Sequence, residues 1–456
     1  MAAHTTVDTP AQPQKEAKGS GQVLTTSFVA FTLMFAVWLM FGILAQPIRD
    51  EFGLSNSQYF WISSLAVLNG SIWRLPAGMI ADRIGGKAVM LYLLITGAVA
   101  AYAVSLASSY LMLLILAFLV GFVGNSFSVG VAWNNAWFSD SRKGFALGLF
   151  GAGNVGASVT KFIGPPLIAA TAGTTYMLGI QGGWRLIPVI YAVLLLMMAV
   201  WLFFGTPMKD RKPGASQSIG EMLEPLKDIR VWRFSLYYVV VFGAYVAFSA
   251  YLPSYYHYSF GIDLWEAGLL AATFIFPASL LRPFGGWLSD KFGARPVMYA
   301  TFFSMLIASG LLMMPNGHIV LHLADGSQKS VLPYDINLWW FVFLVFVVGC
   351  AMGVGKAAVY KHIPTYFPKN VGSVGGLVGM LGGLGGFFLP LMFSYTQEAT
   401  GTWSTAWAIL FLFTLVSLLW MHWTIYRMHK SQSTHLDDLV EVPASGVPTA
   451  PEGSLS

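Results

Sequence analysis

The sequence has little charge: only 10% of its 456 residues are Asp, Glu, Lys or Arg, against roughly a quarter in soluble proteins. It has one cysteine, Cys350, so no intrachain disulfide can form, and no clustered histidines accompany it to suggest a metal site. These shortages exclude a soluble globular protein, a disordered protein and a nucleic-acid binder of the ordinary type. Apolar residues make up 56% of the chain, and the mean hydropathy of +0.65 indicates that lipid is the solvent.

Twelve apolar stretches are long enough to cross a membrane, since a helix of about 20 apolar residues spans the hydrocarbon core. We therefore predict an all-α polytopic membrane protein with two six-helix halves. The stretches are 25–47, 58–80, 88–107, 110–134, 145–170, 184–206, 232–256, 265–288, 297–315, 338–362, 373–397 and 402–426.

The basic residues indicate the orientation of these spans. With the N-terminus inside, 18 of the 25 lie in tails or loops on the cytoplasmic side, and only Arg49, Arg185 and Lys329 lie outside, which is the positive-inside pattern. The pI near 9.1 is thus a topology signal. We expect cytoplasmic disordered tails at 1–22 and 431–456, halves at 23–206 and 232–430, a cytoplasmic linker at 207–231, and residence in the cytoplasmic (inner) membrane.

The two halves repeat each other in sequence. Arg74 precedes Asp82 by eight residues, and Arg282 precedes Asp290 by the same interval. Parallel repeats of six spans are typical of alternating-access transporters, whose sites lie between the halves. The charged loops that close these motifs predict a conformational latch on the cytoplasmic face, formed by Asp82, Arg83, Asp290 and Lys291.

The charges left inside the spans carry the functional argument. They are all basic, and the nearest acidic residue, Glu266, lies at the mouth of a span. An unpaired cation at the bilayer centre costs about 2.5 to 3.5 kcal/mol on insertion scales, so an anionic substrate is the economical source of negative charge. The four cations are Arg74, Lys161, Arg282 and Lys356.

The two arginines are expected to face each other near the midplane, about 12 Å inward of their aspartates. Two planar guanidinium forks fit a small, flat, monovalent oxyanion such as nitrate or nitrite. Sugars would need polar acceptors, and cationic drugs would need a buried acid. For Lys161 and Lys356 two interpretations stay open: side chains that reach toward the membrane surface, or groups that take part in transport.

Spans five and eleven are rich in glycine. Span five contains a literal G-x-G-x-x-G from Gly151 to Gly156, but it follows no strand and no acid lies about 20 residues on, so a dinucleotide site is excluded. Such glycines allow close helix packing and bending. We expect Asn154, near the midplane, to donate to the same anion. The candidate gating glycines are Gly151, Gly153, Gly156, Gly379, Gly382 and Gly383.

The membrane arginines and the two glycine signatures resemble the nitrate/nitrite porter family of the major facilitator superfamily over roughly residues 25 to 426. The resemblance implies anion binding by Arg74 and Arg282 with help from Asn154. It also implies aromatic walls, matched here by Phe35, Phe127, Tyr238 and Phe242. The two span lysines and the run from Ala357 to Pro364 are more similar to the branch of proton-linked nitrate importers.

These observations predict a secondary transporter of nitrate or nitrite, most simply a nitrate importer driven by protons, with strict nitrate/nitrite antiport as the alternative. The other classes weighed are an anion channel and a nitrate sensor. We expect no enzyme activity and no cofactor, and as partners only the anion, protons and membrane lipid, in a monomer. The candidate coupling residues are Lys161, Lys356, His257 and His362.

Overall fold

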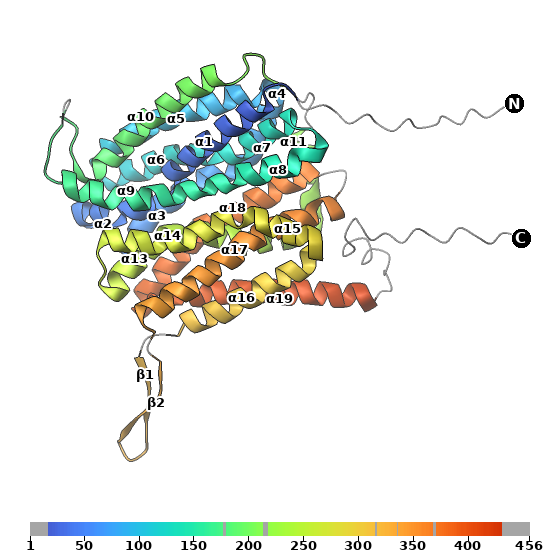
Figure 1. The fold of residues 1–456 in the computed structure, drawn as a ribbon. Helices are drawn as coiled ribbons and strands as arrows, with labels where there is room; N and C mark the ends of the chain where they lie inside the picture. Colours follow the sequence, from blue (N-terminus) through green and yellow to red (C-terminus); the bar gives the residue numbers. More distant parts are fainter. Residues whose placement is uncertain are drawn as a thin grey trace, which may run out of the picture.

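The computed structural model describes residues 17–176, 179–212, 218–314, 317–334, 336–367 and 371–430. Within these ranges the chain is almost entirely helical, and its helices run side by side in two groups that meet along their length (Figure 1). The first group is drawn in blue to green and the second in yellow to red. This is the predicted all-α, two-half arrangement.

The N-terminal half comprises ten α-helices and three short 3₁₀ turns among the described residues. In order they are α1 (Ser20–Trp38), α2 (Phe41–Phe52), α3 (Asn56–Ile72), α4 (Arg74–Ile84), α5 (Gly86–Ser105), α6 (Tyr110–Val120), η1 (Gly121–Asn125), α7 (Ser126–Trp137), α8 (Asp140–Gly151), η2 (Ala152–Val155), α9 (Gly156–Thr171), η4 (Gly183–Arg185) and α10 (Leu186–Gly205).

A short helix, α11 (Ile219–Leu223), and the turn η5 (Glu224–Lys227) lie in the predicted linker. The C-terminal half then contains α12 (Ile229–Tyr238), a π-helical turn η6 (Val239–Gly243), α13 (Ala244–Phe260), α14 (Leu264–Leu280), α15 (Arg282–Phe292), α16 (Ala294–Leu312), α17 (Leu338–Tyr366), α18 (Val371–Thr400) and α19 (Thr405–Lys430).

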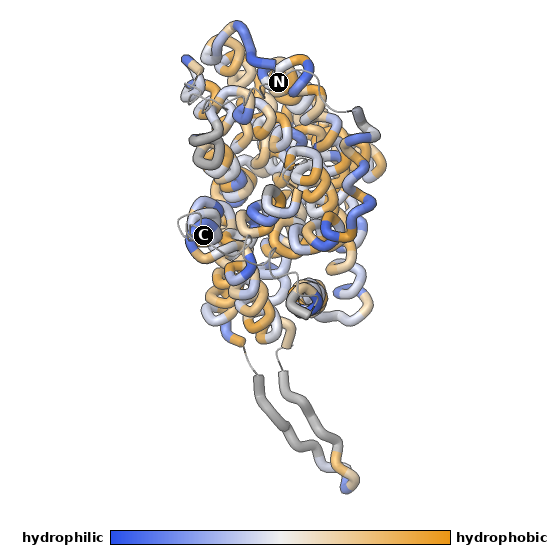
Figure 2. Tube along the Cα trace, turned by 90° about the vertical axis from the view of Figure 1, so that its right-hand side faces the viewer, coloured by the Kyte–Doolittle hydropathy of each residue, from blue (hydrophilic) through white to orange (hydrophobic). Residues whose placement is uncertain are grey.

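Nine helices in the described part are long and apolar enough to cross a membrane, and the bent pair α14–α15 makes a tenth. The other two predicted spans, 58–80 and 145–170, are each divided between two shorter helices, α3–α4 and α8–α9. Apolar residues colour most of the helical trace, while hydrophilic residues gather in the turns at the end where α19 finishes (Figure 2). All twelve predicted spans therefore correspond to helical segments, and several of them are interrupted.

The polar insert between spans nine and ten forms a β-hairpin. Its strands β1 (Gly317–His322) and β2 (Gln328–Tyr334) pair antiparallel, with Leu321 opposite Lys329. Gly326 turns the chain with a φ of 79°, a conformation that glycine adopts without strain. The hairpin projects from the end of the bundle opposite to the last turn of α19 (Figure 1).

At this same end, side chains of the two halves are joined by hydrogen bonds. Asn56 Nδ2 of α3 donates to Gln397 Oε1 of α18 over 2.7 Å, and the backbone N–H of Ser57 donates to Glu398 Oε1 over 2.7 Å. Trp61 Nε1 also donates to the hydroxyl of Tyr395 over 3.0 Å. These bonds close the bundle at this end, beyond the buried arginines.

Candidate substrate-binding site

Arg74 and Arg282 each begin a helix at a break in a span. The α3–α4 break is at Trp73, and the α14–α15 break is at Leu281, where the helix axes differ by 42°. Proline follows closely in both copies, as Pro76 and Pro283, and proline lacks the N–H that a continuous helix needs. The sequence repeat thus becomes a structural repeat that sets both arginines in equivalent positions.

The Arg74 guanidinium lies inside the protein and reaches into the other half. Its side chain is 1% exposed, and Nε donates to the carbonyl of Gly70 in its own half over 2.9 Å. Nη1 donates to the carbonyl of Gly379 in α18 over 3.1 Å, while the buried Nη2 has no hydrogen-bond partner. One donor of the fork is therefore fixed across the interface and another is left for a further acceptor.

Arg282 occupies the equivalent place from the other side. It is 8% exposed, and its buried Nη1 has no hydrogen-bond partner. A Cβ atom added to Gly151 of α8 would lie 3.1 Å from this Nη1 and 3.2 Å from Cζ. Arg282 therefore lies against the glycine of the N-terminal half that corresponds, in the repeat, to Gly379.

Both cations contact the same aromatic ring. The Cζ atoms of Arg74 and Arg282 lie 5.8 and 5.3 Å from the centroid of Phe127 in α7. Their separation cannot exceed the sum of these two distances. The structure therefore brings the two predicted arginines together around Phe127, away from lipid.

The other predicted aromatic residues take different places. Phe242 lies 5.0 Å from Arg74 Cζ, and the Tyr238 ring stacks on Phe242 at 4.9 Å. Phe35 stacks on Tyr245, with the two ring centroids 6.5 Å apart. Cation–π contact favours a guanidinium in such a box, so these rings hold the arginine side chains in position.

Asn154 lies in η2, the 3₁₀ turn that separates α8 from α9. Its side chain is 1% exposed, and both amide atoms, Oδ1 and Nδ2, have no hydrogen-bond partner. Its backbone carbonyl accepts a hydrogen bond from Tyr245 over 3.1 Å. A buried amide without partners is costly, which favours the prediction that Asn154 meets a polar ligand.

Among the described residues several Lys and Arg side chains are buried, whereas no Asp or Glu side chain is buried. Glu266, in the first turn of α14, is exposed. The core accordingly carries fixed positive charge that an anion would neutralise.

The two span lysines do not reach toward the membrane surface, so that interpretation of the sequence is wrong. Both are 0% exposed. Lys161 Nζ donates to Ala157 of its own helix over 3.0 Å. Lys356 Nζ donates to Ala278 of α14 over 2.9 Å and lies 3.2 Å from the ring centroid of Tyr245. Helical depth counted from the nearest loop charge did not capture this packing.

Lys356 is also close to the arginines, since its Nζ lies 5.7 Å from the centroid of Phe242, the ring that Arg74 contacts. The histidines are not. His257 Nδ1 lies 2.7 Å from the carbonyl of Ile262, and His362 Nδ1 lies 2.9 Å from that of Ala358. Of the four candidate coupling residues, the structure joins only Lys356 to the arginine site.

The predicted glycines make room for the site. A Cβ atom at Gly383 would lie 3.2 Å from Arg74 Nη1, one at Gly382 would lie 2.4 Å from the Tyr238 ring, and one at Gly379 would lie 2.8 Å from the Tyr360 hydroxyl. Gly153 and Gly156 instead face α1, where Cβ atoms would meet Phe31 and the backbone of Thr32. The glycines of the two signatures thus have two roles: some leave space for the arginine side chains and their aromatic neighbours, and others allow close helix packing.

Replacing Gly151 by alanine is expected to displace the Arg282 guanidinium by a few tenths of an ångström and to weaken anion binding by about tenfold, as expected for one impaired charge-assisted hydrogen bond. Nitrate titration of the purified protein measures this. The control is Gly148→Ala, where an added Cβ meets nothing within 4 Å. Equal affinity of the two variants would contradict this assignment.

Two of the four predicted latch residues, Asp290 and Lys291, make contacts within their own half. Asp290 pairs with Lys361 of α17, which belongs to the same half. Lys291 Nζ lies 5.2 Å from the rings of Trp287 and Phe292, also neighbours on its own helix. The second copy of the motif therefore ties α15 to α17.

Three residues of the site escaped the sequence interpretation. Trp38 lies 5.4 Å from Arg74 Cζ, the buried hydroxyl of Ser71 has no hydrogen-bond partner and lies beside Gly383, and Tyr245 joins Lys356 to Asn154. Ser71 could have been found from its spacing, because it precedes Arg74 by three residues and thus shares its helix face. Trp38 and Tyr245 carried no such signal.

Comparison with known proteins places this geometry in context. The chain matches the family model of the Major Facilitator Superfamily over residues 26–324 and 258–446. It is 59% identical over 434 residues to the "Probable nitrate/nitrite antiporter NarK1" of Thermus thermophilus, covering 95% of this chain and 98% of the relative. It is 30% identical over 409 residues to the "Probable nitrate transporter NarT" of Staphylococcus epidermidis, covering 89% and 96%.

Among solved structures, a bacterial homologue of the human lysosomal transporter Spinster, inward-facing and unoccupied, matches with a TM-score of 0.64 at 16% identity. The match covers 89% of this chain and 95% of that one. This likeness shows the fold alone.

Proposed function

Because this chain belongs to the nitrate/nitrite transporters of the major facilitator superfamily, we propose that Arg74 and Arg282 bind the transported anion together between its two halves. Each guanidinium offers a buried Nη atom without a partner. A flat oxyanion accepts such donors at its edge, and alternating movement of the halves then exposes it to either side of the membrane.

The observation that carries this proposal is the pair of arginines around Phe127 in a core without a buried carboxylate among the described residues. An arginine does not release its proton, so the pair keeps its charge through the transport cycle. An empty site of two like charges is unfavourable, and the anion relieves that repulsion.

We propose that the anion is nitrate and that its uptake is coupled to protons. Against a negative-inside membrane potential, anion entry is opposed by about 2.3 kcal/mol per 100 mV for each charge, so net uptake needs more than one cotransported proton or an exchanged anion. Lys356 supports the proton version, since lysine can lose its proton. Tyr245 connects it to Asn154 of the other half.

The second candidate is nitrate/nitrite antiport, which the name of the Thermus thermophilus relative favours. In that mechanism the arginine pair is permanently charged. The two halves can then switch between the outward-facing and inward-facing states only when an anion neutralises this charge. No proton carrier is then needed, and Lys356 would serve to place Tyr245.

A flux experiment separates the two. The purified chain is reconstituted in liposomes, and the pH gradient and the internal nitrite are varied independently while nitrate uptake is followed. Proton coupling predicts uptake driven by an inward proton gradient into anion-free vesicles. Uptake that is independent of the pH gradient and requires internal nitrite would establish antiport instead.

Replacing Lys356 by glutamine is expected to abolish uptake driven by the proton gradient while nitrate binding changes by no more than about threefold, because the arginines retain their donors. The matched control is Lys161→Gln, since Lys161 is equally buried and donates to a carbonyl of its own helix. Proton-driven uptake that survives in Lys356→Gln would remove this lysine from the mechanism.

We further propose that the protein acts as a monomer in the cytoplasmic membrane with both termini inside. The distribution of its basic residues supports this orientation. Cysteine labelling at positions 209 and 324, after removal of Cys350, tests it from the two sides of the membrane.

A further inference from the structure

A groove of about 560 Å³ opens between the first turns of α12 and the last turns of α19, and its lining shares no residue with the arginine site. Both helix ends lie at the end of the bundle where α19 finishes (Figure 1). Its lining residues are Ile229, Arg233, Trp420, Trp423, Thr424, Arg427 and Met428.

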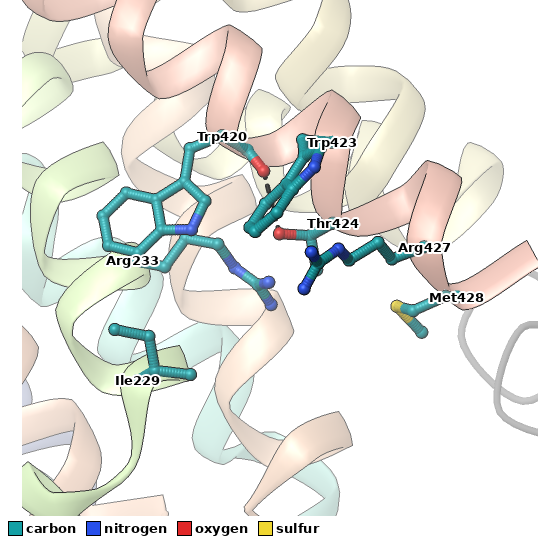
Figure 3. A pocket seen from close by; sticks show the side chains of 7 residues that line it. All are labelled: Ile229, Arg233, Trp420, Trp423, Thr424, Arg427 and Met428. Atoms are coloured by element: carbon teal, nitrogen blue, oxygen red, sulfur yellow. Dashed lines mark hydrogen bonds between the residues drawn. The ribbon is translucent and has the colours of Figure 1, made fainter. Parts of the chain in front are cut away.

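Two arginines converge in this groove. Figure 3 shows the guanidinium groups of Arg233 and Arg427 pointing toward one another, one from each helix. Arg233 is only 7% exposed, and within the described residues it has no hydrogen-bond or ion-pair partner, its one ring contact being Phe234. Arg427 is exposed and lies over the Trp423 ring at 3.9 Å.

The carboxylate of Asp228 is bound to Arg230, and its electrostatic attraction to Arg233 is weaker. Asp228 caps the start of α12, and its Oδ2 accepts from Arg230 Nη2 over 2.6 Å. Those hydrogen bonds from Arg230 hold the pKa of the Asp228 carboxyl below its usual range. A second small cavity that shares Arg233 adds Arg295 and His362 to the surroundings. The groove therefore brings Arg233 and Arg427 together, and no acidic side chain of the described residues lines it.

The surface that leads to the groove is apolar. Along α19 the exposed large side chains recur every three or four residues and so form one stripe of the helix. The stripe consists of Leu412, Val416, Leu419, Trp423 and Tyr426, each between 45% and 59% exposed. In a membrane protein such a stripe faces lipid chains, and tryptophan and tyrosine mark the level of the headgroups. Arg427 follows the last of these residues directly.

We propose that this groove binds the phosphate headgroup of an anionic phospholipid from the adjoining leaflet. The phosphate would accept hydrogen bonds from Arg233 and Arg427, since guanidinium forks bind phosphate oxygens bidentately. The acyl chains would lie along the apolar stripe of α19. Basic pockets between spanning helices on the cytoplasmic side are suited to such lipids, and a lipid here would tie α12 to α19 within the C-terminal half.

Native mass spectrometry of the purified full chain with added phosphatidylglycerol or phosphatidylcholine tests the proposal. The wild type is expected to retain phosphatidylglycerol preferentially, and the double variant Arg233→Gln with Arg427→Gln to bind it about tenfold more weakly. The charge-matched control, Lys209→Gln with Arg211→Gln, removes two exposed cations of the linker and is expected to change binding by less than about twofold.

Inorganic phosphate separates a lipid site from a site for free phosphate. In excess it is expected to leave phosphatidylglycerol bound, because it cannot cover the apolar stripe; displacement of the lipid would overturn the proposal. Equal lipid binding by the double variant and the wild type would overturn it as well, as would an equal loss in the control. If the double variant does not fold, Arg427→Gln alone suffices, since this side chain is exposed; an unchanged affinity in that variant contradicts the proposal.

Discussion

Replacing Arg74 by lysine is expected to weaken nitrate binding by about a hundredfold, because lysine keeps the charge but loses the planar fork and the charge-assisted hydrogen bonds that it makes. The wild-type side chain is held by Gly70 and Gly379 and packed against Phe242. An ammonium on a flexible stem cannot occupy these contacts and bind the anion at once. Equilibrium binding of nitrate to the purified variant measures the effect.

The equivalent change at Arg282 is expected to give a loss of similar size, since the two arginines occupy equivalent positions around Phe127. Arg211→Lys, in the linker, serves as the control and keeps wild-type affinity. Size-exclusion profiles in detergent show that each variant is inserted and folded. A well-folded Arg74→Lys variant with wild-type nitrate affinity would refute two-fork recognition of the anion.

Replacing Gly156 by alanine is expected to destabilise the protein by about 3 kcal/mol or more, the upper range for overpacking a tight contact. The added Cβ would lie 1.9 Å from the carbonyl oxygen of Thr32 in α1. Because the obstacle is backbone, α1 and α9 must move apart. The yield of monodisperse protein and its thermal unfolding temperature measure the loss.

Gly148→Ala, in the preceding helix α8, is the matched control. It lies eight residues away in the same signature, and a Cβ there meets nothing within 4 Å. Because alanine also has the better helix propensity, wild-type or slightly higher stability is expected. If both variants were equally stable, close packing of α1 on α9 would not explain the glycine.

Sequence periodicity predicted the fold because lipid imposes a strong constraint: each span must be long, apolar and helical. It also located Arg74 and Arg282, since an unneutralised cation in such a span stands out. It missed the breaks at Trp73 and Leu281, although proline follows each of them. It also gave no sign that residues 317–334 form a hairpin, because strand pairing there depends on contacts between separate segments.

The two span lysines show what the sequence of a single span cannot predict, namely which neighbouring helices cover a side chain. Counting from a loop charge gives the depth of Lys356 but not the side of the helix that its neighbours cover. The structure covers it with α14 and with Tyr245 of α13. Likewise, the pairing of each arginine with the glycine signature of the opposite half follows from the docking of two repeats, which no local pattern contains.

That reciprocal pairing has a mechanical consequence. The hydrogen bond from Arg74 to the Gly379 carbonyl, and the seating of Arg282 on Gly151, both span the seam between the repeats. A hinge motion that separates the two halves here would move both arginines away from these glycines together. In the function proposed above, separation of the halves would therefore alter both donors of the anion site together.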